Sequence, residues 1–369
     1  MLGTVFERFV QKAPGAVMVR GILERILGEE ALNGLFEQAS DRQYTRELLF
    51  SGVFALMHLV VCKVYPSIHA AYQEHKEAIG TSVTAVYDKL NGIDISTSRA
   101  LVRETARQMA EAVRAMKATC APWLPGYRVK VLDGNCIEAS HHRLGVLREV
   151  AGGALPGKSL ALYEPELEMV TDVIPCEDGH TQERALLGPV LSTLVARDLL
   201  LMDRNFCVRD FLLGIAARGA YFLCRQHKGL AWESAGEERF VGRGDSGAVY
   251  EQWVHIFSPD GTALRCRRIR IALKASTRDG DTELTLLTNL SKSSADARRV
   301  AQLYRKRWTI ETAFQELEAY LSSEINSLGY PKAALFGFCV ALVAYNVLAL
   351  VKAEERGQFS HCNIGPCPL

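Results

Sequence analysis

The chain of 369 residues is long enough for two or three domains, or for one large domain that carries an insertion. Its 48% hydrophobic and 23% charged residues exclude a low-complexity chain, and its net charge of +1 does not by itself demand a nucleic-acid partner. The ten cysteines contain no C-x-x-C pair, so they fit neither a disulfide framework nor a zinc site. We therefore expect a cytoplasmic protein with reduced thiols.

Periodic apolar positions predict an all-helical region over residues 1–125. Within it, one helix is expected near Ser82–Leu90 and a second after the hydroxyl side chains of residues 96–98. A short helix, a glycine-containing turn and a second helix with exposed cations can form a DNA-reading unit. An ordinary helical hairpin has the same pattern, so both interpretations remain open from spacing alone.

The pattern changes to alternating strands after residue 125. Residues 126–228 contain three strands followed by a helix, a strand, a helix and a strand, an order typical of a mixed α/β sheet with helices on its faces. Residues 229–290 carry turns rich in glycine and aspartate between short strands, which predicts a β-rich insertion. Helical periodicity returns over residues 291–353 and completes the α/β unit, and residues 354–369 are expected to form an irregular tail.

One apolar segment, Ala333–Val351, has 19 residues without a charge and is just long enough to span a bilayer. Tyr345 and Asn346 lie within it, and Lys332 and Lys352 flank both ends without the one-sided bias that orients a membrane helix. We therefore favour a buried core helix, and a single membrane anchor is the alternative.

Two acids are predicted to lie at the ends of buried strands. Asp133 directly follows "VKVL", and Asp203 directly follows "LLLM". One such acid is usually a turn residue or a helix cap, but two acids on neighbouring strands repel each other unless a cation or a shifted pKa balances them. Mg²⁺ binds carboxylate oxygens of this kind. Three other acids do not directly follow an apolar strand and are weaker candidates for metal ligands, namely Glu138, Asp172 and Asp178.

A third acid lies in "LYRKRWTIETAFQEL", residues 303–317. At about 100° per residue, a helix here has one apolar stripe and a neighbouring stripe with Tyr304, Arg307 and Glu311. Packing through the apolar stripe would bring Glu311 to the two aspartates, where three carboxylates could hold two cations roughly 3.5–4 Å apart. Arg307 could then bind a phosphate oxygen. The alternative for Glu311 is a surface salt bridge with Arg307.

Basic residues precede this acid. "RRVAQLYRKR", residues 298–307, carries five cations and no anion. Contact with nucleic acid by Arg298, Arg299 and Lys306 is one interpretation, and a solvated charged face is the other. Less specific candidates, for each of which a structural role is the better expectation, are His141, His142, Arg143, Trp232 and Trp253.

These motifs together resemble a known family. "LDGN" at Asp133, "LLLMDRNF" at Asp203 and the Y-x-x-R-x-x-x-E run ending at Glu311 resemble the DDE transposases of bacterial insertion sequences, specifically the IS-four family with its Y-(2)-R-(3)-E-(6)-K signature. The resemblance spans nearly the whole chain. It implies a ribonuclease H-like core interrupted by the β-rich insertion. It also implies that the three acids bind two Mg²⁺ ions, with Mn²⁺ as a substitute, and that Tyr304 and Arg307 contact DNA.

The resemblance further implies a substrate and partners. A water would attack the phosphodiester at the element's end, and the freed 3′-hydroxyl would then attack again; relatives pass through a DNA hairpin. Residues 1–125 would recognise terminal inverted repeats, and two subunits would pair two DNA ends as a homodimer, on target DNA and without a membrane.

Two features depart from the family pattern. Glu318 stands where the signature has lysine, and a carboxylate repels DNA phosphates that a lysine would attract. The chain also ends soon after the apolar segment. One alternative is therefore a catalytically impaired, transposase-derived DNA-binding protein. Another is a metal-dependent nuclease that does not join strands.

Overall fold

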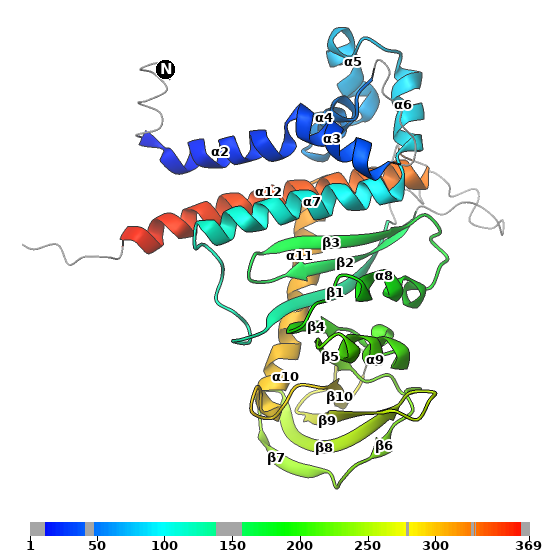
Figure 1. Ribbon diagram of the computed structural model, residues 1–369, viewed down its shortest axis with the longest axis vertical. Helices are drawn as coiled ribbons and strands as arrows, with labels where there is room; N and C mark the ends of the chain where they lie inside the picture. The colour runs from blue at the N-terminus through cyan, green and yellow to red at the C-terminus, as the bar shows by residue number, and fades with distance from the viewer. Residues whose placement is uncertain are drawn as a thin grey trace, which may run out of the picture.

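The computed structural model describes residues 12–40, 48–137, 157–277, 280–325, 328 and 330–362. In this part of the chain, ten strands form one mixed sheet with helices on both faces, and an all-helical region precedes the sheet (Figure 1). The predicted α/β fold class is therefore confirmed.

The first half of the sheet has the strand order β3-β2-β1-β4-β5. These strands are β1 (Arg128–Cys136), β2 (Lys158–Glu164), β3 (Met169–Cys176), β4 (Asp198–Met202) and β5 (Tyr221–Arg225). The pairs β1–β2 and β2–β3 are antiparallel, whereas β1–β4 and β4–β5 are parallel. Three antiparallel strands followed by two parallel strands with helical crossovers form the ribonuclease H-like core that we expected.

The pairing register aligns the two predicted aspartates. Leu132 of β1 pairs with Met202 of β4, so Asp133 and Asp203 follow the last pair of two parallel neighbours, which lie about 4.8 Å apart. Asp133 does not end its strand as predicted, because β1 continues to Cys136 by pairing with β2. The pairing of β1 with β4 ends at Leu132 and Met202. Both aspartates therefore lie at the same end of these parallel strands.

The strands of residues 229–290 continue the same sheet in the order β5-β10-β9-β8-β6, with β7 beside β8. They are β6 (Glu233–Ser234), β7 (Arg239–Arg243), β8 (Gly247–Phe257), β9 (Ala263–Leu273) and β10 (Glu283–Thr288). All their pairings are antiparallel, and β8 and β9 form a long hairpin at the bottom of Figure 1. The predicted β-rich segment is thus an extension of the core sheet, while its limits as a domain stay a prediction.

The N-terminal region is helical in its described residues. Its helices are α2 (Pro14–Leu27), α3 (Glu29–Ala39), α4 (Phe50–Val61), α5 (Ile68–Ile79), α6 (Val83–Gly92) and α7 (Ile95–Ala115). The Ser82 hydroxyl accepts a hydrogen bond from the Ala85 amide and caps α6. Helix α7 begins at Ile95, ahead of the hydroxyl residues predicted to cap it, because Thr97 and Ser98 are buried on its core face.

The remaining helices come after the first three strands in the chain and pack in the two cores on the faces of the sheet. They are the 3-10 helix η3 (Glu183–Leu186), α8 (Leu187–Leu191), the 3-10 helix η4 (Arg204–Phe206), α9 (Arg209–Ala217), α10 (Ala297–Arg305), the 3-10 helix η5 (Lys306–Trp308), α11 (Thr309–Tyr320) and α12 (Pro331–Cys362). Successive strand residues face opposite cores. Leu132 and Met202 pack with α8 and α9, whereas Val131 and Leu201 belong to the larger core that includes α10 to α12.

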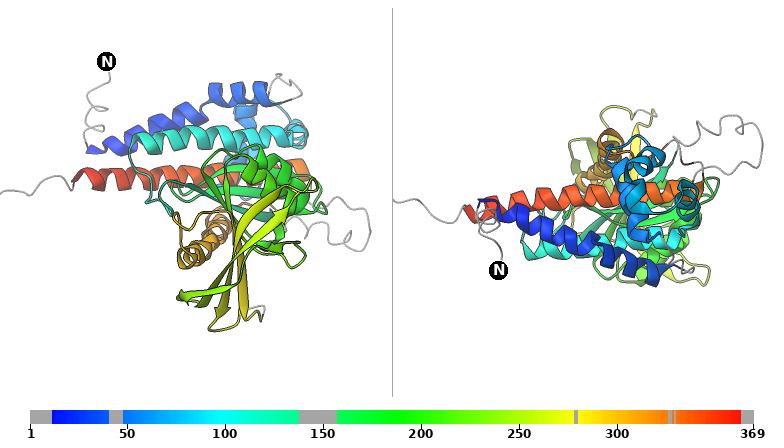
Figure 2. Two further views of the ribbon diagram at one scale, coloured as in Figure 1. Left: turned by 60° about the horizontal axis from the view of Figure 1, so that its bottom comes forward. Right: turned by 90° about the horizontal axis from the view of Figure 1, so that it is seen from above.

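Helix α12 lies along α7, and both helices run beside strand β3 (Figures 1 and 2). By length and composition its residues 331–357 are apolar enough to cross a membrane, but 83% of the most apolar stretch is buried inside the protein. Asn346, fully buried, donates to the Val170 carbonyl at 2.8 Å and accepts from the Val170 amide at 2.9 Å. This packing agrees with the predicted core helix.

The end of α12 corrects one prediction. We expected an irregular tail from residue 354, but the helix continues to Cys362. Ala353 is buried, and Arg356 donates to the Ala118 carbonyl at 3.2 Å and forms an ion pair with Glu168. These contacts beside α7 keep the segment helical where its sequence shows no clear periodicity.

Candidate active site

The segment that carries Glu311 is a helical rod, residues 297–320, that packs against the sheet. The Asp296 carboxylate accepts from the Arg299 amide at 2.7 Å and caps α10. The rod is not one continuous helix, because η5 interrupts it between α10 and α11. Its predicted apolar stripe is confirmed: Leu303, Ile310 and Leu317 are buried in the core. The neighbouring stripe therefore faces the edge of the sheet.

Arg307 joins two of the predicted acids. Its Nη1 lies 3.1 Å from Oδ2 of Asp133, and its Nη2 lies 2.9 Å from Oε1 of Glu311. The predicted salt bridge between Arg307 and Glu311 does form, but Arg307 is only 6% exposed and shares its guanidinium with Asp133. One buried cation thus connects a sheet acid to a helix acid.

The electrostatics place Asp203 at the same site. Burial raises the pKa of Asp133 to about 6; Arg307 opposes this effect, whereas the charges of Glu311 and Asp203 add to it. Burial alone would lower the pKa of the Arg307 guanidinium, but neighbours that include Asp133 and Asp203 raise it. Together with the register of β1 and β4, these effects put Asp203 near the two acids that Arg307 joins. We refer to these three acids as the acidic cluster.

Tyr304 lies inside this cluster. It is buried, and burial raises the pKa of its hydroxyl, an effect that Arg307 opposes and Asp203 increases. The hydroxyl is therefore neutral near pH 7 and available as a hydrogen-bond donor.

The donor set suits hard divalent cations, because carboxylate oxygens are the ligands that Mg²⁺ and Mn²⁺ prefer. Among the residues that the structure describes, however, no three His, Cys, Asp or Glu side chains are grouped closely enough to hold a metal ion. Arg307 contacts both Asp133 and Glu311 and offsets part of their negative charge. The residue types thus suit a metal, whereas in this structure Arg307 contacts two of the three carboxylates.

The other predicted DNA contacts have different surroundings. Arg298 is exposed on α10. Arg299 donates to the Trp123 carbonyl at 2.7 Å, and the Lys306 ammonium lies 5.1 Å from the centre of the Trp123 ring. Arg299 and Lys306 therefore attach the rod to the segment before β1, and a role in DNA binding stays a prediction for all three cations.

The lower-ranked acids have structural partners. Asp172 accepts two hydrogen bonds from Arg99, at 3.0 and 2.8 Å, and Asp178 accepts from the His180 amide and the Thr181 hydroxyl in a turn. Neither acid belongs to the cluster around Arg307. Four further candidates lie outside the described residues, namely Glu138, His141, His142 and Arg143.

The two candidate tryptophans contact arginines of strand β9. Trp253 lies under Arg265, with 4.1 Å from the guanidinium carbon to the ring centre, and Trp232 lies 5.1 Å from Arg268. Trp232 also packs against the smaller core. These contacts support structural roles on the sheet extension.

Two polar residues that we did not single out from the sequence adjoin the aspartates. Glu183 of η3 accepts a hydrogen bond from Asn205 at 2.6 Å, and its carboxylate lies directly against Gly134. Asn205 follows Asp203 by two residues. The available signal was the glycine itself, because a glycine inside a strand often marks a close approach by another group.

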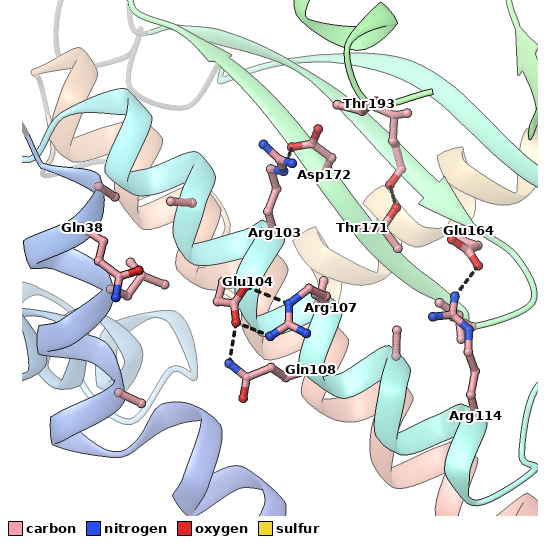
Figure 3. Close-up of a pocket in the computed structure, with 18 of the residues that line it drawn as sticks. Gln38, Arg103, Glu104, Arg107, Gln108, Arg114, Glu164, Thr171, Asp172 and Thr193 are labelled. Carbon is pink, nitrogen blue, oxygen red and sulfur yellow. Dashed lines mark hydrogen bonds and ion pairs between the residues drawn. The ribbon is translucent and has the colours of Figure 1, made fainter. Parts of the chain in front are cut away.

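A separate groove of about 680 Å³ lies between α3, α7 and strands β1 to β3 (Figure 3). Its charged side chains pair with one another, for example Arg107 with Glu104 and Arg114 with Glu164. One of its lining residues is Lys130, near the beginning of β1, so the groove lies away from the acidic cluster. Because these charges are already balanced, we do not assign a ligand site to the groove.

The strand order and the acidic cluster define a ribonuclease H-like protein with a carboxylate centre. Residues 125–347 match the family described as the transposase DDE domain, so the chain belongs to this family. The resemblance noted from the sequence is therefore confirmed.

Several curated relatives are named transposases. The chain is 28% identical over 158 residues to the putative transposase y4zB of Sinorhizobium fredii. This alignment covers 42% of this chain and 43% of that protein. It is 27% identical over 248 residues to the putative transposase InsL for insertion sequence element IS186A of Escherichia coli, with 57% and 61% covered. The transposase for insertion sequence element IS421 of Escherichia coli matches at the same level. The matches thus span about half of the relatives' length.

A solved structure also aligns with the chain. It is the piggyBac transposase synaptic complex with hairpin DNA, determined by cryo-electron microscopy. The TM-score is 0.45 at 10% identity, and the alignment covers 94% of this chain and 78% of that one.

Proposed function

We propose that the chain is a transposase that binds the terminal inverted repeats of an insertion sequence and performs Mg²⁺-dependent DNA cleavage and strand transfer. The observation that carries the proposal is the clustering of Asp133, Asp203 and Glu311, which come from two neighbouring strands and a distant helix, around the buried Arg307. Membership of the DDE-domain family supports it.

In this proposal Asp133, Asp203 and Glu311 would hold two Mg²⁺ or Mn²⁺ ions. When bound, such ions supply Lewis acid chemistry for attack on a phosphodiester. Arg307, released from the two carboxylates, would bind a non-bridging phosphate oxygen through its planar fork. Tyr304 would donate a hydrogen bond to the same strand.

The partners are proposed on the same basis. The helical residues 1–125 would recognise the inverted repeats, the core would comprise residues 126–228 and 291–353 around the extension at 229–290, and two subunits would pair two DNA ends. Exposed cations such as Arg298 and Lys306 would contact the DNA backbone, because phosphate contacts dominate DNA affinity. The protein would act in the cytoplasm, at the nucleoid and on target DNA.

One observation favours a second candidate. Glu318, at the position of the signature lysine, is exposed on α11 rather than neutralised by a described partner. A negative charge there would weaken the grip on DNA. The second candidate is therefore a DNA-binding protein of transposase origin with impaired catalysis.

The test is strand cleavage of DNA that carries both ends of the protein's own element. We expect cleavage at the ends with Mg²⁺ or Mn²⁺ and none with EDTA. D133N, D203N and E311Q should each lower the cleavage rate by at least about a thousandfold, because groups that act as one unit fail together. DNA binding should persist in all three variants.

E318Q is the matched control, because it removes a charge from the same helix outside the cluster. It should cleave at least as well as the original protein. Binding without cleavage by the original protein would favour the second candidate, and cleavage that survives all three substitutions would refute the proposed site.

A further inference from the structure

We propose that Glu183 is a positioning residue that holds the turn after Asp203 against the strand that carries Asp133. The inference deepens the proposed function, on which it rests for its metal-binding readout. Its basis is a set of contacts that join the two aspartates through a third element, η3.

The first contact reaches the turn of Asp203. Oε2 of Glu183 accepts from Nδ2 of Asn205 at 2.6 Å. The adjacent Arg184 donates from Nε to the Asn205 carbonyl at 2.8 Å and to its side-chain oxygen at 3.2 Å. Two successive residues of η3 therefore hold one asparagine through its backbone and its side chain.

Asn205 is closely coupled to Asp203. It lies in the single 3-10 turn η4, which Asp203 precedes as the N-cap residue, and the Phe206 amide donates to the Asp203 carbonyl at 3.2 Å. A turn this short has little freedom to move one residue without the others. Fixing Asn205 thus also fixes the backbone from which the Asp203 carboxylate projects.

The second contact reaches the strand of Asp133. A Cβ atom added to Gly134 would lie 2.1 Å from Oε1 and 2.7 Å from Cδ of Glu183, distances that real Cβ contacts do not reach. The Glu183 carboxylate therefore occupies the space that any other residue at position 134 would need. Glycine directly after Asp133 leaves room for the Glu183 carboxylate in this position, and a larger residue would force that side chain to move away.

The contacts need an acceptor oxygen at position 183 and not a charge, because the partner Asn205 is a neutral amide. Glutamine supplies the same acceptor, whereas alanine supplies none. This difference separates a positioning residue from a fourth metal ligand, which would require the carboxylate. Residues that orient metal ligands typically contribute a factor of about 10–100 in metal affinity.

The experiment measures Mn²⁺ affinity of the full chain by isothermal titration calorimetry. We expect E183A and G134A each to weaken binding by about tenfold or more, and E183Q to stay within about threefold of the original protein. E177A, which changes an exposed acid before η3, is the control and should bind normally. Loss of affinity in E183Q equal to that in E183A would overturn the proposal.

A double-mutant cycle keeps the test independent of the metal. Because E183A and G134A disrupt one contact, their effects on the metal-free unfolding free energy should be non-additive in the double variant. Additive effects would overturn the proposal. If the original protein binds no Mn²⁺, or if D133N leaves binding unchanged, the proposed function fails and this cycle alone decides the role of Glu183.

Discussion

Arg307 shows how one buried side chain can join acids that come from distant segments of the chain. It is buried and pairs with both Asp133 and Glu311, which come from segments 178 residues apart in numbering, since 311 − 133 = 178. Removing a cation from such a position leaves two partly buried carboxylates without their cation, which is more costly than losing a surface ion pair.

At this scale we predict that R307Q lowers the metal-free unfolding free energy by about 2–4 kcal/mol, less than for a fully buried pair because Glu311 is partly exposed. Urea denaturation in EDTA measures it. R305Q is the matched control: Arg305 lies 3.4 Å from Asp245 and both side chains are exposed, so its cost should stay below about 1 kcal/mol. Equal losses in both variants would contradict the role assigned to Arg307.

At the scale of elements, helix α12 protects an edge of the sheet. Strand β3 ends the strand order, and an uncovered edge strand exposes backbone groups that can pair with another chain. Asn346 satisfies both the amide and the carbonyl of Val170, as a neighbouring strand would. Among the α12 side chains that the structure describes, Asn346 is the one polar side chain that is fully buried, and the strand beneath it explains its presence there.

We predict that N346L destabilises the protein by about 2–4 kcal/mol, because it leaves two buried backbone groups of Val170 without partners. Hydrogen exchange should also show faster exchange of the Val170 amide. L348A, at an exposed position of the same helix, should cost less than about 1 kcal/mol. An unchanged exchange rate in N346L would show that Asn346 does not protect the edge.

At the scale of the whole molecule, Arg267 connects the sheet extension to the helical rod. Its side chain is fully buried on β9, its Nε lies 2.6 Å from Glu251 of β8, and its Nη1 donates to the carbonyls of Leu290, Ser291 and Ala295. These carbonyls precede α10, so the extension fixes where the rod begins. The position of Glu311 thus depends on strands that contribute no acid to the cluster.

We predict that R267M lowers the unfolding free energy by about 3–5 kcal/mol, because it leaves the buried Glu251 with a single cationic neighbour, Lys292. The double variant R267M/E251M should recover much of this loss, since an apolar pair avoids the desolvated charge. Thermal and urea unfolding measure both. R265M, at an exposed position of β9, should cost less than about 1 kcal/mol. If the double variant recovers no stability, the loss in unfolding free energy comes from the contacts of Arg267 with the three carbonyls and not from Glu251.

The features predicted correctly from the sequence are those that depend on local patterns. Alternation and helical periodicity predict the order of strands and helices, the apolar stripe through Leu303 and Ile310, and the burial of most of Ala333–Val351. The same patterns indicate Asp133 and Asp203, because an acid after an apolar strand is visible in a few residues.

What the amino-acid sequence determined by itself was therefore the kinds of elements, their order and the acids they present. Only the tertiary structure decided that Arg307 bridges Asp133 and Glu311, that Glu183 lies against Gly134, and that α12 continues past residue 353. Each of these depends on register and packing between segments far apart in the chain. Local periodicity contains no information on such distances, because many packings of the same elements satisfy the same pattern.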